Sequence, residues 1–142
     1  MIKISKQDYK KIVDHAVAQL PNEACGLIAG KTDGADKRIE KVYLLTNTDQ
    51  SREHFSLDPK EQLAAIKDMR SLGYIPLGNW HSHPETQSRP SEEDKRLAYD
   101  KNASYLILSL MERENPVLNS FHIEGTDAKK EELIIEDRSE IE

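Results

Sequence analysis

The stretch SYLILSL at residues 104–110 is an almost continuous apolar run in a chain that is otherwise rich in charge. Strands at a protein surface alternate apolar and polar residues, whereas a continuous apolar run is typical of a strand buried on both of its faces. This segment therefore predicts a central strand in a sheet that other elements cover on both sides.

Two segments carry clear helix-start signals. Ser5 and Asp8 fit a capping box, and the apolar residues that follow recur at three- and four-residue spacing over roughly 14 residues, as on one face of a helix. These residues are Tyr9, Ile12, Val13, Ala16, Val17 and Leu20. Asp58, followed by a proline and then a glutamate, predicts a second helix that runs to about residue 71 and ends at Gly73.

The remaining elements are mostly strands. Apolar or alternating segments predict strands at 2–5, 24–30, 38–47, 54–57, 74–83, 104–110, 117–125 and 131–136. A short helix is expected from Ser91 to about Asp100. We therefore predict the α/β (α+β) class: a single domain over residues 1–136 with a central mixed β-sheet flanked by helices. Residues 137–142 are expected to form a frayed tail.

Charge argues against two classes of partner. The chain has 20 Lys and Arg residues against 26 Asp and Glu, for a net charge of −6, and it has no basic block that would bind nucleic acid or an anionic membrane. No segment approaches the roughly 20 apolar residues of a membrane span. The N-terminus lacks the apolar run of a signal peptide, and one cysteine cannot form an internal disulfide. We expect a cytoplasmic protein.

Two histidines one residue apart lie at the end of the strand predicted at 74–83. Because side chains of a strand alternate between its faces, His81 and His83 point to the same side, where their imidazoles can converge on one ion. Zinc accepts imidazole nitrogen and carboxylate oxygen, and a catalytic zinc site has three protein ligands and a water. Asp94, which the following loop brings back toward the strand, is placed to be the third ligand.

Each part of this pattern also has a purely structural interpretation. Ser91 and Asp94 fit a capping box that starts the next helix. A His-x-His pair on a strand is more often solvated or hydrogen-bonded than bound to a metal. In the complete pattern one residue separates His81 from His83, and seven residues separate His83 from Ser91. Two further residues separate Ser91 from Asp94. This long pattern meets a chemical need at every position and favours the metal site.

The spacing resembles the JAMM motif of the MPN-domain metalloproteases. In that family a glutamate stands upstream, at the edge of the strand after the first helix, and Glu23 of PNEACGLIAG is in the matching position. Other similarities are Asn47 after the second strand of that region and HFSLDP before the second helix. The resemblance runs from about residue 5 to about residue 124 and is to a compact, prokaryotic-type member.

The resemblance implies a zinc-dependent protease or isopeptidase. His81, His83 and Asp94 would bind Zn²⁺. Glu23 would hold the attacking water and take its proton as general base, and Ser91 would donate a hydrogen bond to the oxyanion. The implied substrate is a ubiquitin-like or sulfur-carrier protein attached through a C-terminal Gly-Gly tail, which we expect to lie along a strand edge near the site.

Two other functions are open at this point. The chain could be a non-catalytic MPN-type module that binds a partner, or a zinc amidohydrolase of a small substrate. Glu23 alone could serve only as a cap or an ion-pair partner. Cys25 faces the same side as Glu23 if both lie on a strand, so it is either a small buried residue or a thiol close enough to the zinc site to be oxidised.

The remaining histidines and two large aromatic residues receive structural assignments. We place His54 and His122 on strands, His15 on the polar side of the first helix, and Trp80 and Tyr105 in the core.

Overall fold

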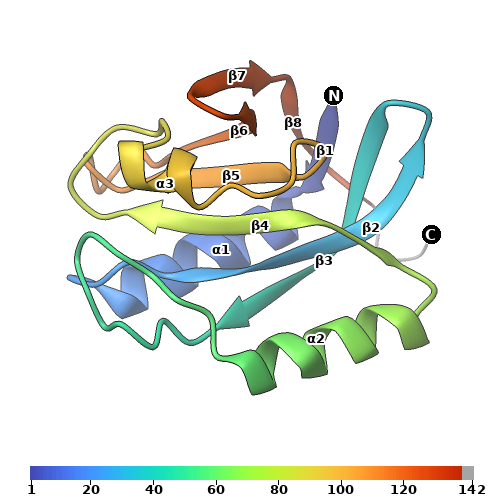
Figure 1. Cartoon of the computed structure of the whole chain (residues 1–142), viewed down its shortest axis with the longest axis horizontal. Helices are drawn as coiled ribbons and strands as arrows, with labels where there is room; N and C mark the ends of the chain where they lie inside the picture. Colours follow the sequence, from blue (N-terminus) through green and yellow to red (C-terminus); the bar gives the residue numbers. More distant parts are fainter. Residues whose placement is uncertain (139–142) are drawn as a thin grey trace.

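The computed structural model describes residues 1–138, and over this range the chain folds into eight strands and three helices (Figure 1). In chain order the elements are β1 (Ile2–Ser5), α1 (Lys6–Gln19), β2 (Cys25–Asp33), β3 (Asp36–Leu45), α2 (Pro59–Ser71), β4 (Ile75–His83), α3 (Glu92–Arg96), β5 (Ser104–Ser109), β6 (Val117–Glu124), β7 (Asp127–Glu131) and β8 (Leu133–Glu136).

The strands form one sheet in the order β7-β6-β5-β4-β2-β3-β1-β8. The pairs β4–β5, β1–β3 and β1–β8 are parallel, and the other neighbours are antiparallel. The predicted α+β class with a central mixed sheet is therefore confirmed. Because β4 lies between β2 and β5, its main chain is held on both sides, which makes it a rigid support for the side chains at its end.

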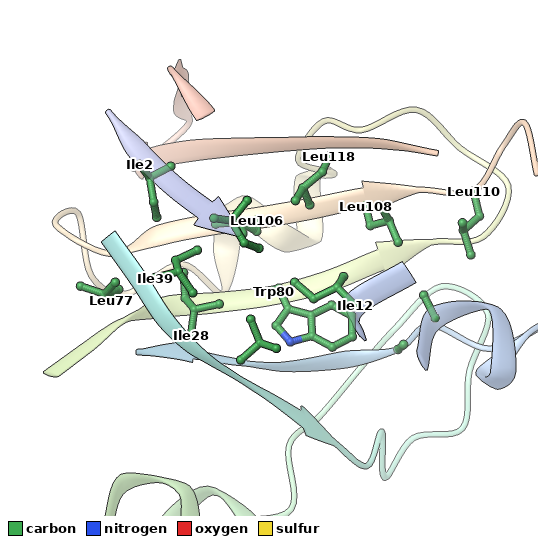
Figure 2. Close-up of a cluster of buried hydrophobic side chains, with 14 residues drawn as sticks. Ile2, Ile12, Ile28, Ile39, Leu77, Trp80, Leu106, Leu108, Leu110 and Leu118 are labelled. Atoms are coloured by element: carbon green, nitrogen blue, oxygen red, sulfur yellow. The ribbon is translucent and has the colours of Figure 1, made fainter. Parts of the chain in front are cut away.

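Helix α1 covers one face of the sheet. Its Ile12 and Ala16 are fully buried and belong to the same apolar cluster as Trp80 of β4 and Leu106 of β5 (Figure 2). Burial of a large apolar side chain contributes about 1.5–3 kcal/mol, so this cluster is a main source of stability. Gly26 is required beside it, because a Cβ there would lie 2.3 Å from Nε1 of Trp80.

Helices α2 and α3 lie on the opposite face. Leu27 and Ala29 of β2 point away from α1 and pack with Ala65 and Met69 of α2. With both faces covered, every residue of β5 is buried, as the apolar run at 104–110 predicts.

Both predicted helix starts are confirmed by their caps. The side chain of Ser5 accepts a hydrogen bond from the backbone N–H of Asp8, and α1 then runs for 14 residues. The side chain of Asp58 accepts from Lys60 N at 2.8 Å, and α2 ends at Ser71, close to the expected position. These caps depend on residues only a few positions apart, which is why the sequence reveals them.

Three predicted elements differ in the structure. Residues 54–57 do not form a strand; the segment has one isolated bridge, between Asn47 and Leu57, because the side chain of Asn47 bonds to its backbone at His54 and Ser56. The helix that begins after Ser91 ends at Arg96 rather than near Asp100. The segment 131–136 is not one strand, because β7 ends at Glu131 after pairing with β6, and β8 then pairs with β1. Strand β7 itself was not predicted.

Two residues of α1 do not lie as the periodicity predicts. His15 is not on a polar face: it is half-buried, with its ring edge-on to Trp80 at 6.0 Å between centroids. Val17, which we placed on the apolar stripe, is 47% exposed. Within residues 1–138, none of the helices has both the length and the apolar character needed to cross a bilayer.

The predicted tail at 137–142 falls partly outside the described residues, which end at 138. Its first two residues contact α1 and β3. Asp137 pairs with Lys6 of α1 at 3.1 Å, and Arg138 Nη1 donates to the carbonyl of Ile39 on β3 at 2.6 Å.

Candidate metal centre

His81 and His83 lie on the last residues of β4, on the face covered by α2 and α3. The register places His81 between Cys25 of β2 and Ile107 of β5. The intervening Ser82 points to the other face, as the alternation predicts. Both histidine side chains are buried, at 3% and 6% exposure, so their rings are fixed by the sheet below them.

The two imidazoles and the carboxylate of Asp94 converge on one point. Nε2 of His81 lies 3.1 Å from Nε2 of His83, and each of these nitrogens lies 3.2 Å from Oδ2 of Asp94. Ligands about 2.0–2.1 Å from a tetrahedral zinc are separated by about 3.3 Å. The donor set and the size of this triangle therefore fit a zinc ion. Within residues 1–138, these three residues are the one group of His, Cys, Asp and Glu side chains gathered closely enough to hold a metal.

Protonation in the triad also suits a cation. Burial alone would raise the pKa of Asp94, but hydrogen bonds to His81 and His83 hold it far below its ordinary value, so the carboxylate is ionised. Burial lowers the pKa of His81. Nδ1 of His83 lies 2.9 Å from the carbonyl oxygen of Gln87, which can only accept, so Nδ1 carries a proton. In the metal-free protein Nε2 of His83 bonds to Asp94; burial lowers the pKa of His83, but the bonds to Asp94 and Gln87 raise it overall. A metal at Nε2 would displace the proton that Nε2 shares with Asp94.

Helix α3 fixes Asp94 through its own N-terminus. Ser91 Oγ accepts from Asp94 N at 3.0 Å, and Ser91 N donates to Asp94 Oδ2 at 2.9 Å. This is the capping box of the structural interpretation, and the same contacts aim the carboxylate at the two histidines. The two interpretations are thus compatible. Because Ser91 Oγ accepts from the backbone, its O–H remains free to donate into the neighbouring cleft.

Glu23 precedes β2, and its backbone is held from three directions. Its N–H donates to Ser51 O at 2.8 Å, and its carbonyl accepts from Asn47 Nδ2 at 3.0 Å. The next residue, Ala24, donates its N–H to Ser82 Oγ at 2.8 Å. Ser82, between the two histidines, thus links the Glu23 segment directly to the end of β4.

The carboxyl of Glu23 shares a cleft of about 550 Å³ with His83 and Ser91. Glu23 is 5% exposed. Burial raises the pKa of Glu23 to about 8, while the nearby His83 lowers it and the negative charge of Asp94 raises it further. This value belongs to the metal-free protein. The positive charge of a bound cation would lower the pKa of Glu23 and leave its carboxylate ionised, as a general base must be before it takes a proton.

The loop between β3 and α2 closes over the site and contains residues whose roles the sequence did not reveal. Phe55 stacks on the ring of His81, with centroids 4.7 Å apart. His54, which is in this loop and not on a strand, contacts the carboxylate of Glu93 on α3. Asn47 holds the loop by donating to the carbonyl of His54. In Figure 1 this loop and α3 both lie at the end of β4. Asn47 was noticed as a similarity, but the contacts of Phe55 and His54 depend on the folded chain.

Cys25 lies on the site's face, opposite His81 in the register, and is fully buried. Burial raises the pKa of its thiol to about 12, with further contributions from Glu61 and Glu23. Because the thiolate is the reactive form, these surroundings fit a small buried residue better than a redox sensor. His122, which we assigned to a strand and not to the site, is on β6 as predicted and pairs with Glu131 at 2.9 Å.

Comparison with known proteins gives consistent results. The model of the prokaryotic homologs of the JAB domain matches residues 5–124. The CysO-cysteine peptidase of Mycobacterium tuberculosis is 35% identical over 112 residues, which are 79% of this chain and 75% of that protein. The desampylase of Haloferax volcanii is 32% identical over 95 residues, or 66% of this chain and 67% of that protein. A Desulfitobacterium hafniense protein of known solution structure is 52% identical, with a TM-score of 0.91 and coverage of 99% of this chain and 97% of that one.

Proposed function

The chain belongs to the prokaryotic branch of the JAB (JAMM/MPN) family and is a hydrolytic peptidase or isopeptidase, and from this premise we propose that it uses zinc to release ubiquitin-like sulfur-carrier proteins from their conjugates. The scissile bond is the amide that follows the carrier's C-terminal Gly-Gly tail. The observation that carries the zinc part of the proposal is the triangle of His81, His83 and Asp94, with sides of 3.1–3.2 Å.

Each residue has a separate task in this proposal. His81, His83 and Asp94 hold the ion, which when bound supplies a Lewis acid that polarises the carbonyl and acidifies water toward a pKa of about 7. Glu23 orients the attacking water, takes its proton and passes that proton to the leaving amine. Ser91 donates its O–H to the oxygen that becomes negative in the transition state. Glu23 and Ser91 line the same cleft, which supports this division of roles.

We propose a course for the carrier tail that differs from the strand-edge arrangement expected from the sequence. The free edges of the sheet belong to β7 and β8, and none of the five site residues lies on either strand. Strand β4 is paired on both sides. We therefore place the extended tail in the cleft between the 51–54 and 84–93 segments, where its main chain can bond to loop backbone. Glycines suit such a position because they let the two backbones approach closely.

The charge of the cleft favours one kind of leaving group. Its lining includes Glu53, Glu85, Glu92 and Glu93, with Arg52 as the one Lys or Arg among the lining residues. A free amino acid would bring its own carboxylate to these acidic side chains, whereas a lysine within a protein brings none. We propose that conjugates to protein lysines are better substrates than a carrier–cysteine adduct.

The test is a cleavage assay with zinc-loaded protein and two conjugates of one sulfur carrier, one to a protein lysine and one to cysteine. We expect cleavage after Gly-Gly in both, with a higher kcat/KM for the lysine conjugate at low salt and a smaller difference at high salt. Glu23→Gln is the matched inactive control. The proposal would be contradicted if protein that holds one zinc per chain cleaved neither conjugate. Cleavage of small amides alone would indicate an amidohydrolase.

A further inference from the structure

A small cavity lies beside the metal ligands, on the same face of the sheet. Its volume is about 30 Å³, and its walls are mostly apolar; they are formed by Phe55, Asn79, His81, Asp94, Leu97, Tyr105, Ile107 and Ile123. In the described part of the chain, three buried side-chain polar atoms have no hydrogen-bond partner, and two of them belong to residues of this wall. They are Nδ1 of His81 and Oδ1 of Asn79.

Both atoms have complementary hydrogen-bonding needs. Since the proposed function uses Nε2 of His81 as a metal ligand, the neutral ring must carry its proton on Nδ1, which then needs an acceptor. Asn79 precedes His81 by two residues on β4, so its side chain is on the same face, and its Oδ1 is an acceptor. Leaving such groups unsatisfied in a protein interior destabilises the folded state.

Other residues of the wall do not meet these needs. Tyr105 is the register partner of Asn79 on β5, but its hydroxyl donates to the carbonyl of Asp100. Phe55 covers His81 with an apolar ring and offers no acceptor. A single water needs roughly 10–15 Å³ and two to four polar partners. The cavity is large enough, and His81 and Asn79 supply two partners.

We propose that Asn79 is a positioning residue for the metal site and acts through one buried water. The water accepts from Nδ1–H of His81 and donates to Oδ1 of Asn79. This chain of bonds keeps the proton on Nδ1 and turns the Nε2 lone pair toward His83 and Asp94. For His83 the carbonyl oxygen of Gln87 accepts the Nδ1–H hydrogen bond directly, at 2.9 Å. The inference rests on the proposed metal site, and Asn79 touches neither metal nor substrate.

The first test measures zinc affinity by competition with a chromophoric chelator. Asn79→Leu has nearly the same size but no acceptor, whereas Asn79→Asp keeps an acceptor. Loss of the partner of a metal-binding histidine typically weakens metal binding by about 10- to 100-fold, so we expect that loss for Asn79→Leu and none for Asn79→Asp. A residue that merely fills space would give the opposite ranking, because leucine fills the same volume without a buried charge.

The wild-type protein supplies a second readout that needs no variant. In the NMR spectrum of the zinc-loaded protein, we expect a slowly exchanging Nδ1–H proton of His81 with a cross-peak to a long-lived water. A spectrum with no such cross-peak would overturn the inference even if Asn79→Leu failed to fold. Wild-type protein that binds no zinc would instead contradict the proposed function, and equal zinc affinity of wild type and Asn79→Leu would contradict only the role of Asn79.

Discussion

Replacing Glu23 with glutamine should make the metal-free protein more stable. The same substitution should strongly reduce the turnover of the zinc-loaded protein. Glu23 is 5% exposed and has a pKa raised to about 8, mainly by burial. In the unfolded chain a glutamate has a pKa of about 4.3. Between these two values the folded protein binds one proton more than the unfolded chain, so its stability decreases as the pH rises. Glutamine does not titrate and removes this dependence.

The size of the effect follows from the two pKa values. Each unit of difference is worth about 1.4 kcal/mol. At pH 7 the unfolded glutamate is ionised, whereas Glu23 in the folded protein still holds most of its proton, which costs the folded state about 3 kcal/mol. The free energy of unfolding of the Glu23→Gln variant should therefore exceed that of the wild type by about 3 kcal/mol at pH 7 and should be nearly equal to it at pH 4. A gain of this size raises the Tm of a domain of this length by about 10 °C.

Urea unfolding of the chelator-treated proteins between pH 4 and pH 8 measures this difference. Glu85→Gln is the matched control, because it makes the same side-chain change at an exposed position of the same cleft. With zinc restored, Glu23→Gln should keep the metal and lose about 10²- to 10⁴-fold in kcat. Parallel pH profiles for wild type and Glu23→Gln, or near-normal turnover of the variant, would refute the reasoning.

Three further substitutions separate positioning, chemistry and stability. Ser82→Ala removes the hydrogen bond from Ala24 N that links the Glu23 segment to β4. Urea unfolding should show a free energy of unfolding lower by about 1–3 kcal/mol, and kcat should fall while the zinc content stays the same. Ser91→Ala should lower kcat by about 10²- to 10³-fold in steady-state assays without raising KM. Glu131→Gln should lower the unfolding free energy at pH 7 by about 2–3 kcal/mol, because the buried carboxylate accepts charge-assisted bonds that include one from His122. Burial opposes ionisation of Glu131, but bonds from two serines and His122 lower its pKa, so this stabilisation is present above about pH 4 and should disappear as the pH falls through the lowered pKa.

The parts of the fold that depend on near neighbours in sequence were predictable. The caps at Ser5 and Asp58 use partners two or three residues away. The alternation of a strand was enough to place His81 and His83 on one face. Strand β7 gave no such signal, because its sequence DAKKE is polar and it is a strand only by pairing with β6 in a hairpin.

The convergence of His81, His83 and Asp94 was predictable, but the residues that surround them were not. The donor types, their spacing and the resemblance to the JAMM motif pointed to these three residues. Phe55 reaches the site through long-range packing, which no local pattern encodes. Asn79 shares a face of β4 with His81, but the cavity that gives its side chain a role depends on the folded chain. The apolar character of 54–57 suggested a strand because an aromatic ring that covers a histidine has the same hydropathy as one in a sheet.

We propose that two imidazoles and one carboxylate of this chain bind a single zinc ion and leave one position for solvent. X-ray absorption at the zinc edge of the purified protein measures this coordination. We expect a four-coordinate zinc with scattering from two imidazole rings and two oxygens, at about 2.0–2.1 Å. A six-coordinate, all-oxygen ion without imidazole scattering, or the same spectrum from His83→Ala, would contradict it.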